Sequence, residues 1–392
     1  MVRKGADSAE RIAYREKPVA PAVLRTAPVW IEVSLSAIRH NFRQIRASIP
    51  SRTKILAVVK ANAYGHGLLP AARAMTQAGA DLLGVASVVE GVALRQAGLN
   101  VPILILGQCL PEEAPLVVQH QLIQAVGDLA SARALSRAAC SRDCQVAFHL
   151  KVDTGMGRYG VWHEEAPELH RKILQLPGLR PEGIMSHLAM AAQSVQVTQE
   201  QMSRFSELLR RFRRERLPTG TRHLANSVGM IRFPDSHWDL VRTGLLLYGV
   251  SPLKGDGMRQ LQPALTLKSR IRFLKRLKAG HTVSYGGTFR AERPTGVATI
   301  PAGYAHGYPR ALSNRADVLI RGRRARVIGL VTMEDLMVDV TEIPGVSVGD
   351  EVVLIGRQGG GSVTAEELAR HARTIPYEIL VGLSPAIPRI TD

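Results

Sequence analysis

The sequence is poor in cysteine and lacks any long apolar run. Its three cysteines, Cys109, Cys140 and Cys144, form no CxxC pair and have no histidine at metal-ligand spacing, which argues against a disulfide framework and a metal site. No stretch of about 20 apolar residues occurs, and residues 1–28 contain no signal-peptide core. We therefore expect a cytoplasmic protein that has no membrane partner.

Low-complexity sequence is also absent, so an ordinary globular protein is expected. The 392 residues are 45% hydrophobic and 21% charged, a composition that excludes disordered and fibrous classes. A chain of this length exceeds the size at which one hydrophobic core usually stops growing. Two domains are therefore the first expectation.

Acidic residues are few, with 33 Asp and Glu against 51 Lys and Arg, which gives a formal net charge of +18. Such an excess could serve a nucleic acid or another anionic partner. The densest basic runs, residues 210–216 and 321–326, lie in no helix-turn-helix, zinc-finger or RNA-recognition pattern. We interpret them as a solvated basic face and expect no specific nucleic acid partner. A basic nucleic-acid-binding barrel remains the non-enzymatic alternative.

Short apolar runs alternate with helical patterns after a basic leader, residues 1–28. A strand is predicted at 30–33, followed by a helix capped by Ser36 and ending near residue 49. Alternating strands and helices indicate parallel βα units, and eight strands would close a TIM barrel. The eight candidates are 55–59, 82–86, 103–106, 123–126, 146–152, 183–187, 223–225 and 240–242.

The pattern changes after residue 262 to β-rich alternation with glycine-containing turns. Strands are predicted at 295–300, 317–321 and 351–355, and one helix at 365–372 opens with the capping-box spacing of Thr364 and Glu367. The predicted fold is therefore α/β, with an N-terminal (β/α)8 TIM-like barrel at 29–262 and a C-terminal mainly-β domain at 263–392. The strand at 30–33 could pack on the C-terminal domain.

Polar residues gather where the predicted barrel strands end, which is the position of the chemistry in barrel enzymes. No helix-facing pattern explains their positions. They are Lys60, Asp153, Arg158, His187, Asn226, Ser227 and Arg242.

Lys60 closes an apolar strand, an unusual place for a long cation. Desolvation there favours the neutral amine, a nucleophile suited to Schiff-base chemistry. Taken alone, a lysine at a strand end is more often simply solvated. The segment AVVKANAYGHG, residues 57–67, changes this balance because it is specific over its whole length.

That segment resembles the pyridoxal-phosphate lysine signature of the alanine racemase family. The resemblance covers about residues 30–389, because further blocks occur in the order in which the family has them. These blocks are KVDTGMGRYG from Lys151, SHL from Ser186, HLANSVG from His223, VRTGLLLYG from Val241, SYGGTF from Ser284, IPAGYAHGYPR from Ile300 and TMEDLMVDVT from Thr332.

The resemblance implies an amino-acid racemase that uses pyridoxal 5'-phosphate and two acid/base groups, Lys60 and Tyr285. The tyrosine would come from the other subunit of a homodimer, which makes the active site composite. His187 would lie between Tyr285 and Arg242 and couple them. Arg242 would face the pyridine nitrogen, although an arginine paired with a structural carboxylate is the alternative reading of that position.

The resemblance also implies the remaining contacts of the cofactor and of a small amino-acid substrate. Arg158 and Met333 would bind the substrate carboxylate, and Lys151 matches a lysine that is carbamylated in many members, the alternative being an ordinary solvated lysine. The other cofactor-binding positions would be Tyr64, Asn226, Ser227, Gly244, Leu245 and Tyr304. D-Alanine made in this way would supply peptidoglycan synthesis.

Four positions depart from the family pattern and put the substrate entrance in doubt. Thr332 and Glu334 stand in place of the usual Cys and Asp, and His306 in place of an Asp found in many members. Pro385 stands where some members have a phosphate-contacting tyrosine. A racemase of broader or other amino-acid specificity is the alternative enzyme, because the same lysine, tyrosine and arginine would serve any α-amino acid.

Overall fold

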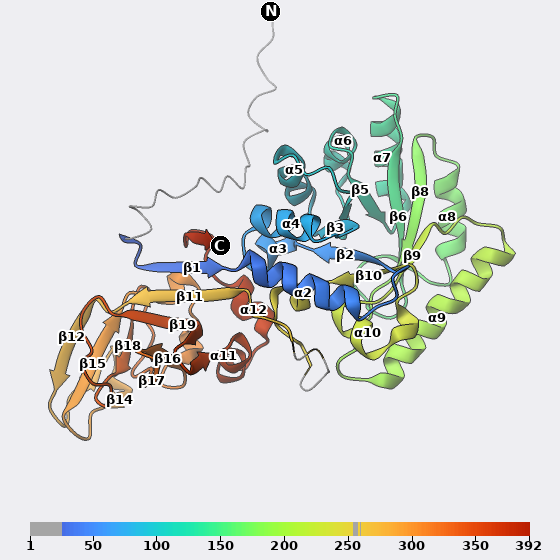
Figure 1. Cartoon of the computed structure of the whole chain (residues 1–392). Coiled ribbons are helices and arrows are strands. Elements are labelled where there is room, and N and C mark those ends of the chain that lie inside the picture. Colours follow the sequence, from blue (N-terminus) through green and yellow to red (C-terminus); the bar gives the residue numbers. More distant parts are fainter. Residues whose placement is uncertain (1–25, 254–257, 259) are drawn as a thin grey trace, which may run out of the picture.

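A barrel and a set of antiparallel sheets lie next to each other in the computed structural model (Figure 1). The structure describes residues 26–253, 258 and 260–392, so most of the predicted leader, 1–28, lies outside the described residues. Among the residues that it describes, no helix is both long and apolar enough to cross a membrane.

The barrel consists of eight parallel strands in the order β10-β2-β3-β4-β5-β6-β8-β9. The two end strands are joined by two backbone hydrogen bonds of 3.0 Å, from Asp239 to Arg222 and from Arg242 to Ala225, so the barrel is nearly closed. The strands are β2 (Lys54–Val58), β3 (Leu82–Val85), β4 (Ile103–Ile105), β5 (Ile123–Val126), β6 (Val146–Asp153), β8 (Leu179–Met185), β9 (Thr221–His223) and β10 (Leu240–Thr243).

All eight predicted barrel strands are present, and the predicted fold class is confirmed. Their apolar runs are buried, as expected for parallel strands covered on both faces. Two strands were placed too late. The sixth was predicted at 183–187 instead of Leu179–Met185, and the seventh at 223–225 instead of Thr221–His223. The chain leaves the barrel direction after His223 because Asn226 caps the next helix, accepting a hydrogen bond from Gly229 at 2.9 Å.

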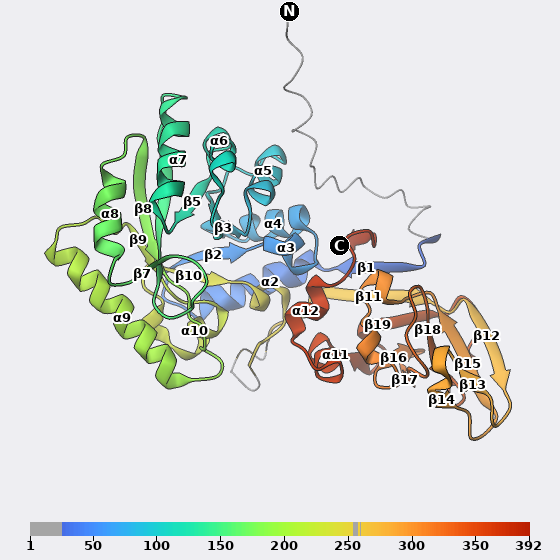
Figure 2. The same cartoon turned by 180° about the vertical axis from the view of Figure 1, so that it is seen from behind.

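Helices surround the barrel on its outer side (Figures 1 and 2). The first begins after Ser34, whose hydroxyl accepts from Ala37, so the predicted cap at Ser36 was wrong. The carboxylate of Asp392 binds both serine hydroxyls, at 2.9 and 2.6 Å, which a local pattern does not show. The helices are α2 (Leu35–Ala47), α4 (Leu68–Gln77), α5 (Val88–Gln96), α6 (Ala114–Gln119), α7 (Leu129–Cys140), α8 (Ala166–Leu174), α9 (Val195–Arg214) and α10 (Ser227–Arg232).

The C-terminal part is built on a sheet of order β17-β16-β19-β11-β1-β21, with β20 (Gly361–Val363) beside β19. Strand β1 pairs antiparallel with β11 and parallel with β21, so the strand nearest the N-terminus belongs to this sheet. The sheet strands are β1 (Val29–Val33), β11 (Leu265–Arg270), β16 (Asp317–Ile320), β17 (Arg323–Arg326), β19 (Glu351–Gln358) and β21 (Arg389–Thr391).

Two smaller sheets and two helices complete this part of the chain. Helix α11 (Ala365–Ala372) is capped as predicted, because Thr364 accepts from the Glu367 amide at 3.2 Å. The Glu367 carboxylate, however, binds Arg324 and not the cap, so the predicted capping box is only half formed. The other elements are β12 (Phe273–Leu277), β13 (Thr282–Val283), β14 (Phe289–Arg290), β15 (Thr295–Ile300), β18 (Leu336–Asp339) and α12 (Pro376–Val381).

Candidate active site

A cavity of about 620 Å³ lies at the C-terminal ends of the barrel strands. This cavity is lined by most of the polar residues that were predicted at the strand ends. Two residues from the C-terminal part, Ile375 and Tyr377, also line it. The predicted site residues in its wall are Lys60, Tyr64, Lys151, Arg158, His187, Asn226, Ser227, Arg242 and Gly244.

Lys60 stands directly after β2 and opens the segment α3 (Lys60–Tyr64). Burial lowers the pKa of its ammonium group, and the nearby guanidinium of Arg158 lowers it further, while the Glu90 carboxylate acts in the opposite direction. Both leading causes favour the neutral amine. Lys60 therefore has the electrostatic surroundings of a nucleophilic or proton-accepting lysine.

The residues after Lys60 form a left-handed turn, which the sequence does not reveal. Ala61, Asn62, Ala63 and Tyr64 have φ values of 54°, 53°, 52° and 54°. This conformation costs roughly 1–2 kcal/mol for each residue other than glycine, so surrounding contacts must hold it. The turn packs against helix α12, where a Cβ on Gly65 would stand 2.2 Å from the carbonyl oxygen of Leu380.

Tyr64 ends this turn with its ring among other aromatic rings. Its centroid lies 5.0 Å from that of Tyr248 and 6.0 Å from that of Tyr377. Gly244 approaches so closely that a Cβ there would lie 2.4 Å from the Tyr64 hydroxyl. Ser227 also meets Gly244, because its hydroxyl accepts the Gly244 amide at 3.0 Å.

This corner fits a phosphate group. It combines hydroxyl groups with backbone amides and with the space that only a glycine leaves. The adjacent Thr243 hydroxyl is buried and has no partner among the described residues. Leu245, which was also predicted to contribute its backbone here, follows Gly244 and is fully buried outside the cavity wall.

Arg242 lies in β10, one residue before the end of the strand, and is buried. Its guanidinium donates to the carbonyls of Ser186 at 2.6 Å and Leu224 at 3.0 Å, and to Nδ1 of His187 at 3.2 Å and of His223 at 3.1 Å. None of these four bonds, which are those found within the described part of the chain, goes to a carboxylate. The alternative reading of Arg242 as half of a structural ion pair is therefore wrong.

Arg242 fixes the protonation of the histidines around it. Since a guanidinium only donates, Nδ1 of both His187 and His223 must accept, which places their protons on Nε2. His223 Nε2 then donates to Nδ1 of His149 at 2.7 Å. Burial, followed by the charge of Arg242, holds the pKa of His187 well below its usual range, so this ring stays neutral.

In the sequence, Asp153 stands between two cationic residues of the cavity wall, Lys151 and Arg158. Burial and then the charges of Arg242 and Arg158 lower the pKa of Lys151 to about 7, so much of this amine is neutral near neutral pH. A neutral amine is the form that can react with carbon dioxide. Asp153 accepts three backbone amides, those of residues 155–157, at 2.7–2.8 Å and so shapes the loop that carries Arg158.

Besides Leu245, three more predicted residues lie outside this cavity. Tyr285, Tyr304 and Met333 are 75%, 45% and 56% exposed and belong to the C-terminal part. Tyr304 donates its amide to Thr332 at 3.1 Å, which ties it to the loop of Met333, and Ser284 beside Tyr285 donates to Leu330 at 2.7 Å. The three side chains thus occupy neighbouring loops. Within one chain they do not line the cavity that contains Lys60.

Two of the departures from the family pattern contact each other. His306 Nε2 lies 3.7 Å from the Glu334 carboxylate, and His306 Nδ1 accepts the Gly303 amide at 3.3 Å. The proton of the neutral ring must therefore sit on Nε2, facing Glu334. These two positions act as a pair next to Met333 and Tyr304.

Tyr377 is a site residue that sequence reasoning missed. The resemblance placed the phosphate-contacting tyrosine of some family members at the position of Pro385, which does not line the cavity. Tyr377 reaches it from α12, behind Pro376 at the first helical position. The only sequence signal near it was Pro376, a residue that often opens a helix, and it does not show that the helix reaches the cavity.

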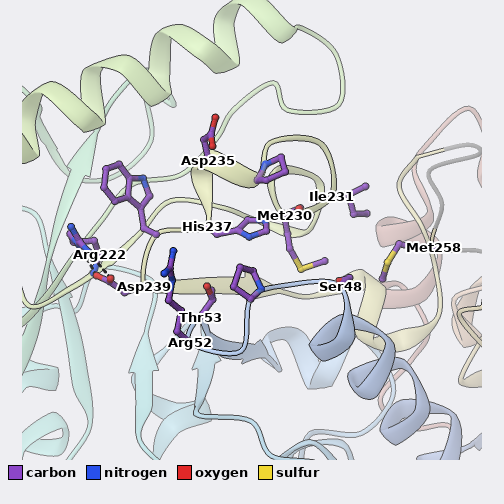
Figure 3. Close-up of a pocket in the computed structure, with 13 residues that line it drawn as sticks. Ser48, Arg52, Thr53, Arg222, Met230, Ile231, Asp235, His237, Asp239 and Met258 are labelled. Atoms are coloured by element: carbon purple, nitrogen blue, oxygen red, sulfur yellow. Dashed lines mark hydrogen bonds and ion pairs between the residues drawn. The ribbon is translucent and has the colours of Figure 1, made fainter.

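A second cavity, of about 800 Å³, is separate from this site (Figure 3). Arg52 and Thr53 in its wall precede β2, and Asp239 precedes β10, so it lies at the opposite end of the barrel. Arg222 and Asp239 pair there through two bonds of 2.7 Å. In barrel enzymes this end serves stability and not chemistry.

Fold and site together define a barrel enzyme with a half-buried lysine after its first barrel strand, completed by a β-rich C-terminal part. The family described as "Alanine racemase, N-terminal domain" matches residues 33–252, and "Alanine racemase, C-terminal domain" matches residues 264–391. The chain belongs to the alanine racemase family of pyridoxal-phosphate-dependent enzymes, and its activity is the isomerisation of alanine.

Individual relatives agree with this assignment. Alanine racemases of Symbiobacterium thermophilum and Halothermothrix orenii are 46% and 44% identical, over 92% and 93% of this chain and 96% and 97% of theirs. The solved alanine racemase of Streptomyces coelicolor has a TM-score of 0.89 at 33% identity, covering 94% of this chain and 99% of that one. That of Bacillus anthracis, solved with bound L-Ala-P, has a TM-score of 0.87 at 33% identity and covers 93% and 95%.

Proposed function

We propose that the chain interconverts L- and D-alanine by a two-base mechanism in which Lys60 and Tyr285 act on opposite faces of the substrate. Racemisation removes a proton from one face of the α-carbon and returns one to the other, so two groups must alternate as acid and base. The observation that supports Lys60 as one of them is its half-buried position in the strand-end cavity, with its pKa lowered by desolvation and by Arg158.

Tyr285 cannot serve the cavity of its own chain from the exposed loop on which it lies. We propose that the protein is a homodimer and that Tyr285 of the partner subunit completes each site. Tyr285, Tyr304 and Met333 form one exposed group on neighbouring loops, which is the arrangement that a composite site requires. The predicted division into a barrel at 29–262 and a β domain at 263–392 is part of this proposal.

Pyridoxal 5'-phosphate, when bound, draws electron density from the α-carbon and makes its proton easier to remove. Lys60 would hold its aldehyde carbon, and Arg242 would face its ring nitrogen. The phosphate group would contact Tyr64, Ser227 and the backbone at Gly244 and Leu245, with Tyr377 and Tyr304 nearby. Asn226 and His187 would complete the surroundings.

Arg242 directs the outcome toward racemisation. A carboxylate in its place would keep the ring nitrogen protonated. A guanidinium only donates hydrogen bonds, so it would leave that nitrogen unprotonated, although burial lowers the pKa of Arg242 to about 9. Electron withdrawal is then weaker, so a proton removed by one base is returned quickly by the other. His187, neutral and with its proton on Nε2, can donate a hydrogen bond to the oxygen of the partner's Tyr285 and so stabilise its anion.

Arg158 and the backbone of Met333 would bind the substrate carboxylate, the latter from the partner subunit. Carbamylation of Lys151 would replace a cation next to Arg158 with an anion able to hold the guanidinium in place. The enzyme would work in the cytoplasm and supply D-alanine for peptidoglycan.

A racemisation assay with a panel of L-amino acids tests this function. We expect D-alanine from L-alanine at the highest rate, and no product from Lys60→Ala in either direction. A panel in which another amino acid is racemised faster would support the broad-specificity alternative instead. Absence of racemisation with every substrate by the cofactor-loaded protein would contradict the proposal.

A further inference from the structure

The carboxylate of Glu90 contacts the turn that carries Lys60. Glu90 belongs to α5 and is only 5% exposed. Its Oε1 accepts the backbone amide of Ala61, the residue after Lys60, at 2.6 Å. A buried acidic side chain is thus bonded to the backbone next to the cofactor lysine.

The other oxygen of the same carboxylate holds the loop after β3. Oε2 accepts the amides of Ala86 at 2.8 Å and Ser87 at 3.3 Å, while the Ser87 hydroxyl accepts the Glu90 amide at 3.3 Å. In a capping box the acidic side chain reaches back only to its own N-cap. Here it also reaches Ala61, so Glu90 links the ends of two adjacent barrel strands.

The turn after Lys60 depends on such contacts. Asparagine visits the left-handed region readily, but alanine and tyrosine do not, and three of the four residues are of those types. Asn62 holds the far side of the turn, where its side chain accepts the Leu68 amide at 2.7 Å. Glu90 holds the near side, next to Lys60.

Glu90 also opposes the positive charge around Lys60. The charges of Arg158 and Arg242, both in the same cavity wall, lower the pKa of Lys60. Asp153, the other carboxylate close by, is bonded to three backbone amides of its own loop. Glu90 is the group whose charge raises the pKa of Lys60.

We propose that Glu90 is a positioning residue for racemisation, which fixes the backbone of Lys60 through Ala61 and supplies the negative charge that faces the Lys60 amine. This inference rests on the proposed function, in which Lys60 is one of the two bases. Glu90 itself touches neither substrate nor cofactor in this account. It acts through Lys60.

The first test compares Glu90→Gln with Ser87→Ala. Both variants damage the cap of α5, but Ser87→Ala leaves the bond from Glu90 to Ala61 intact. We expect Glu90→Gln to lower kcat roughly tenfold or more, since small misplacements of a reacting group are costly, and Ser87→Ala to stay within about twofold of wild type. Equal losses in the two variants would show that Glu90 only caps the helix.

The second test measures the Lys60 amine itself. The pH dependence of its labelling by trinitrobenzenesulfonate is followed by peptide mass spectrometry in the full-length chain without cofactor, with circular dichroism as the check of folding. Removal of the carboxylate should move the midpoint for Lys60 to lower pH in Glu90→Gln, whereas Ser87→Ala should leave it unchanged. An unchanged midpoint in Glu90→Gln would overturn the electrostatic part of the proposal.

Glu90→Asp separates geometry from charge and remains informative if Glu90→Gln does not fold. It keeps the charge but is one methylene too short to span both loops. The midpoint should stay near that of wild type while kcat falls, and an unchanged kcat would overturn the positioning role. If wild type racemises alanine and Lys60→Ala does not, the proposed function stands whatever the Glu90 variants show.

Discussion

Arg242 donates a hydrogen bond of 3.2 Å to Nδ1 of His187, and both side chains line the cavity at the C-terminal ends of the barrel strands. The bond fixes the His187 proton on Nε2, and burial keeps the ring neutral. In the mechanism that we propose, one guanidinium would therefore set both the electron demand of the cofactor and the hydrogen bond that His187 offers to the second base.

Replacement of Arg242 should change both the electron demand of the cofactor and the hydrogen bond that His187 offers. In Arg242→Lys a single ammonium group cannot make the four bonds of the guanidinium, so we expect kcat/KM to fall about 10²-fold. In Arg242→Glu the ring nitrogen gains a proton-holding partner, and pyruvate formed from alanine by transamination should rise relative to racemisation. A lactate dehydrogenase assay measures the pyruvate. No increase in that ratio, in a folded variant, would count against the role given to Arg242.

Gly244→Ala should weaken cofactor binding, because the new methyl group would stand 2.4 Å from the Tyr64 hydroxyl in the phosphate corner. We expect a loss of about tenfold or more in affinity, the effect of one lost or displaced hydrogen-bonded contact to a charged group. Titration of the cofactor-free protein with pyridoxal phosphate, followed by absorbance, gives the constant. Gly360→Ala is the matched control, since nothing lies within 4 Å of its added Cβ, and it should bind like wild type.

The barrel could be predicted from the sequence because its strands are short, continuous apolar runs buried on both faces. The cap at Ser34 could not, since Asp392, more than 350 positions away, binds both serines. The left-handed turn at residues 61–64 could not be predicted either, because its sequence Ala-Asn-Ala-Tyr contains no glycine that would indicate a positive φ. Tyr377 was missed for a related reason: α12 reaches the cavity only through tertiary packing on that turn.

His170 lies outside the active site and should make the stability of the folded protein depend on pH. Burial lowers its pKa to about 4, although its Nε2 donates to the Pro218 carbonyl at 2.9 Å. In the unfolded chain the histidine has its ordinary pKa near 6.5. Between about pH 4 and 6.5 it is therefore protonated in the unfolded chain but neutral in the folded protein. Stability is therefore complete above that window and is lost as the pH falls, by up to about 1.4 kcal/mol per pH unit for this group.

His170→Gln removes this titration while keeping a donor for Pro218. Urea unfolding at pH 7 and pH 5 should show a smaller loss of stability between the two conditions in the variant than in wild type. Equal losses would mean that His170 titrates normally in the folded protein. Racemisation at pH 8 should be unchanged, because His170 lies on α8 away from the cavity.

Tyr285→Phe should impair one direction of proton exchange more than the other. The variant retains Lys60 but loses the hydroxyl on the opposite face, which we assign to L-alanine. Exchange of the α-proton with deuterated solvent, followed by NMR, should slow for L-alanine by at least about 10²-fold, the usual contribution of one acid/base group, and less for D-alanine. Equal rates of exchange from the two enantiomers would refute the assignment of two bases.

If Lys60 and Tyr285 act together across two subunits, mixing two inactive variants should restore activity. Lys60→Ala and Tyr285→Phe proteins are each nearly inactive, but a mixed dimer would contain one site with both residues intact. Statistical exchange should restore about a quarter of wild-type activity, since half of the dimers are mixed and each has one working site. No recovery, with subunit exchange demonstrated by native mass spectrometry, would contradict the composite site.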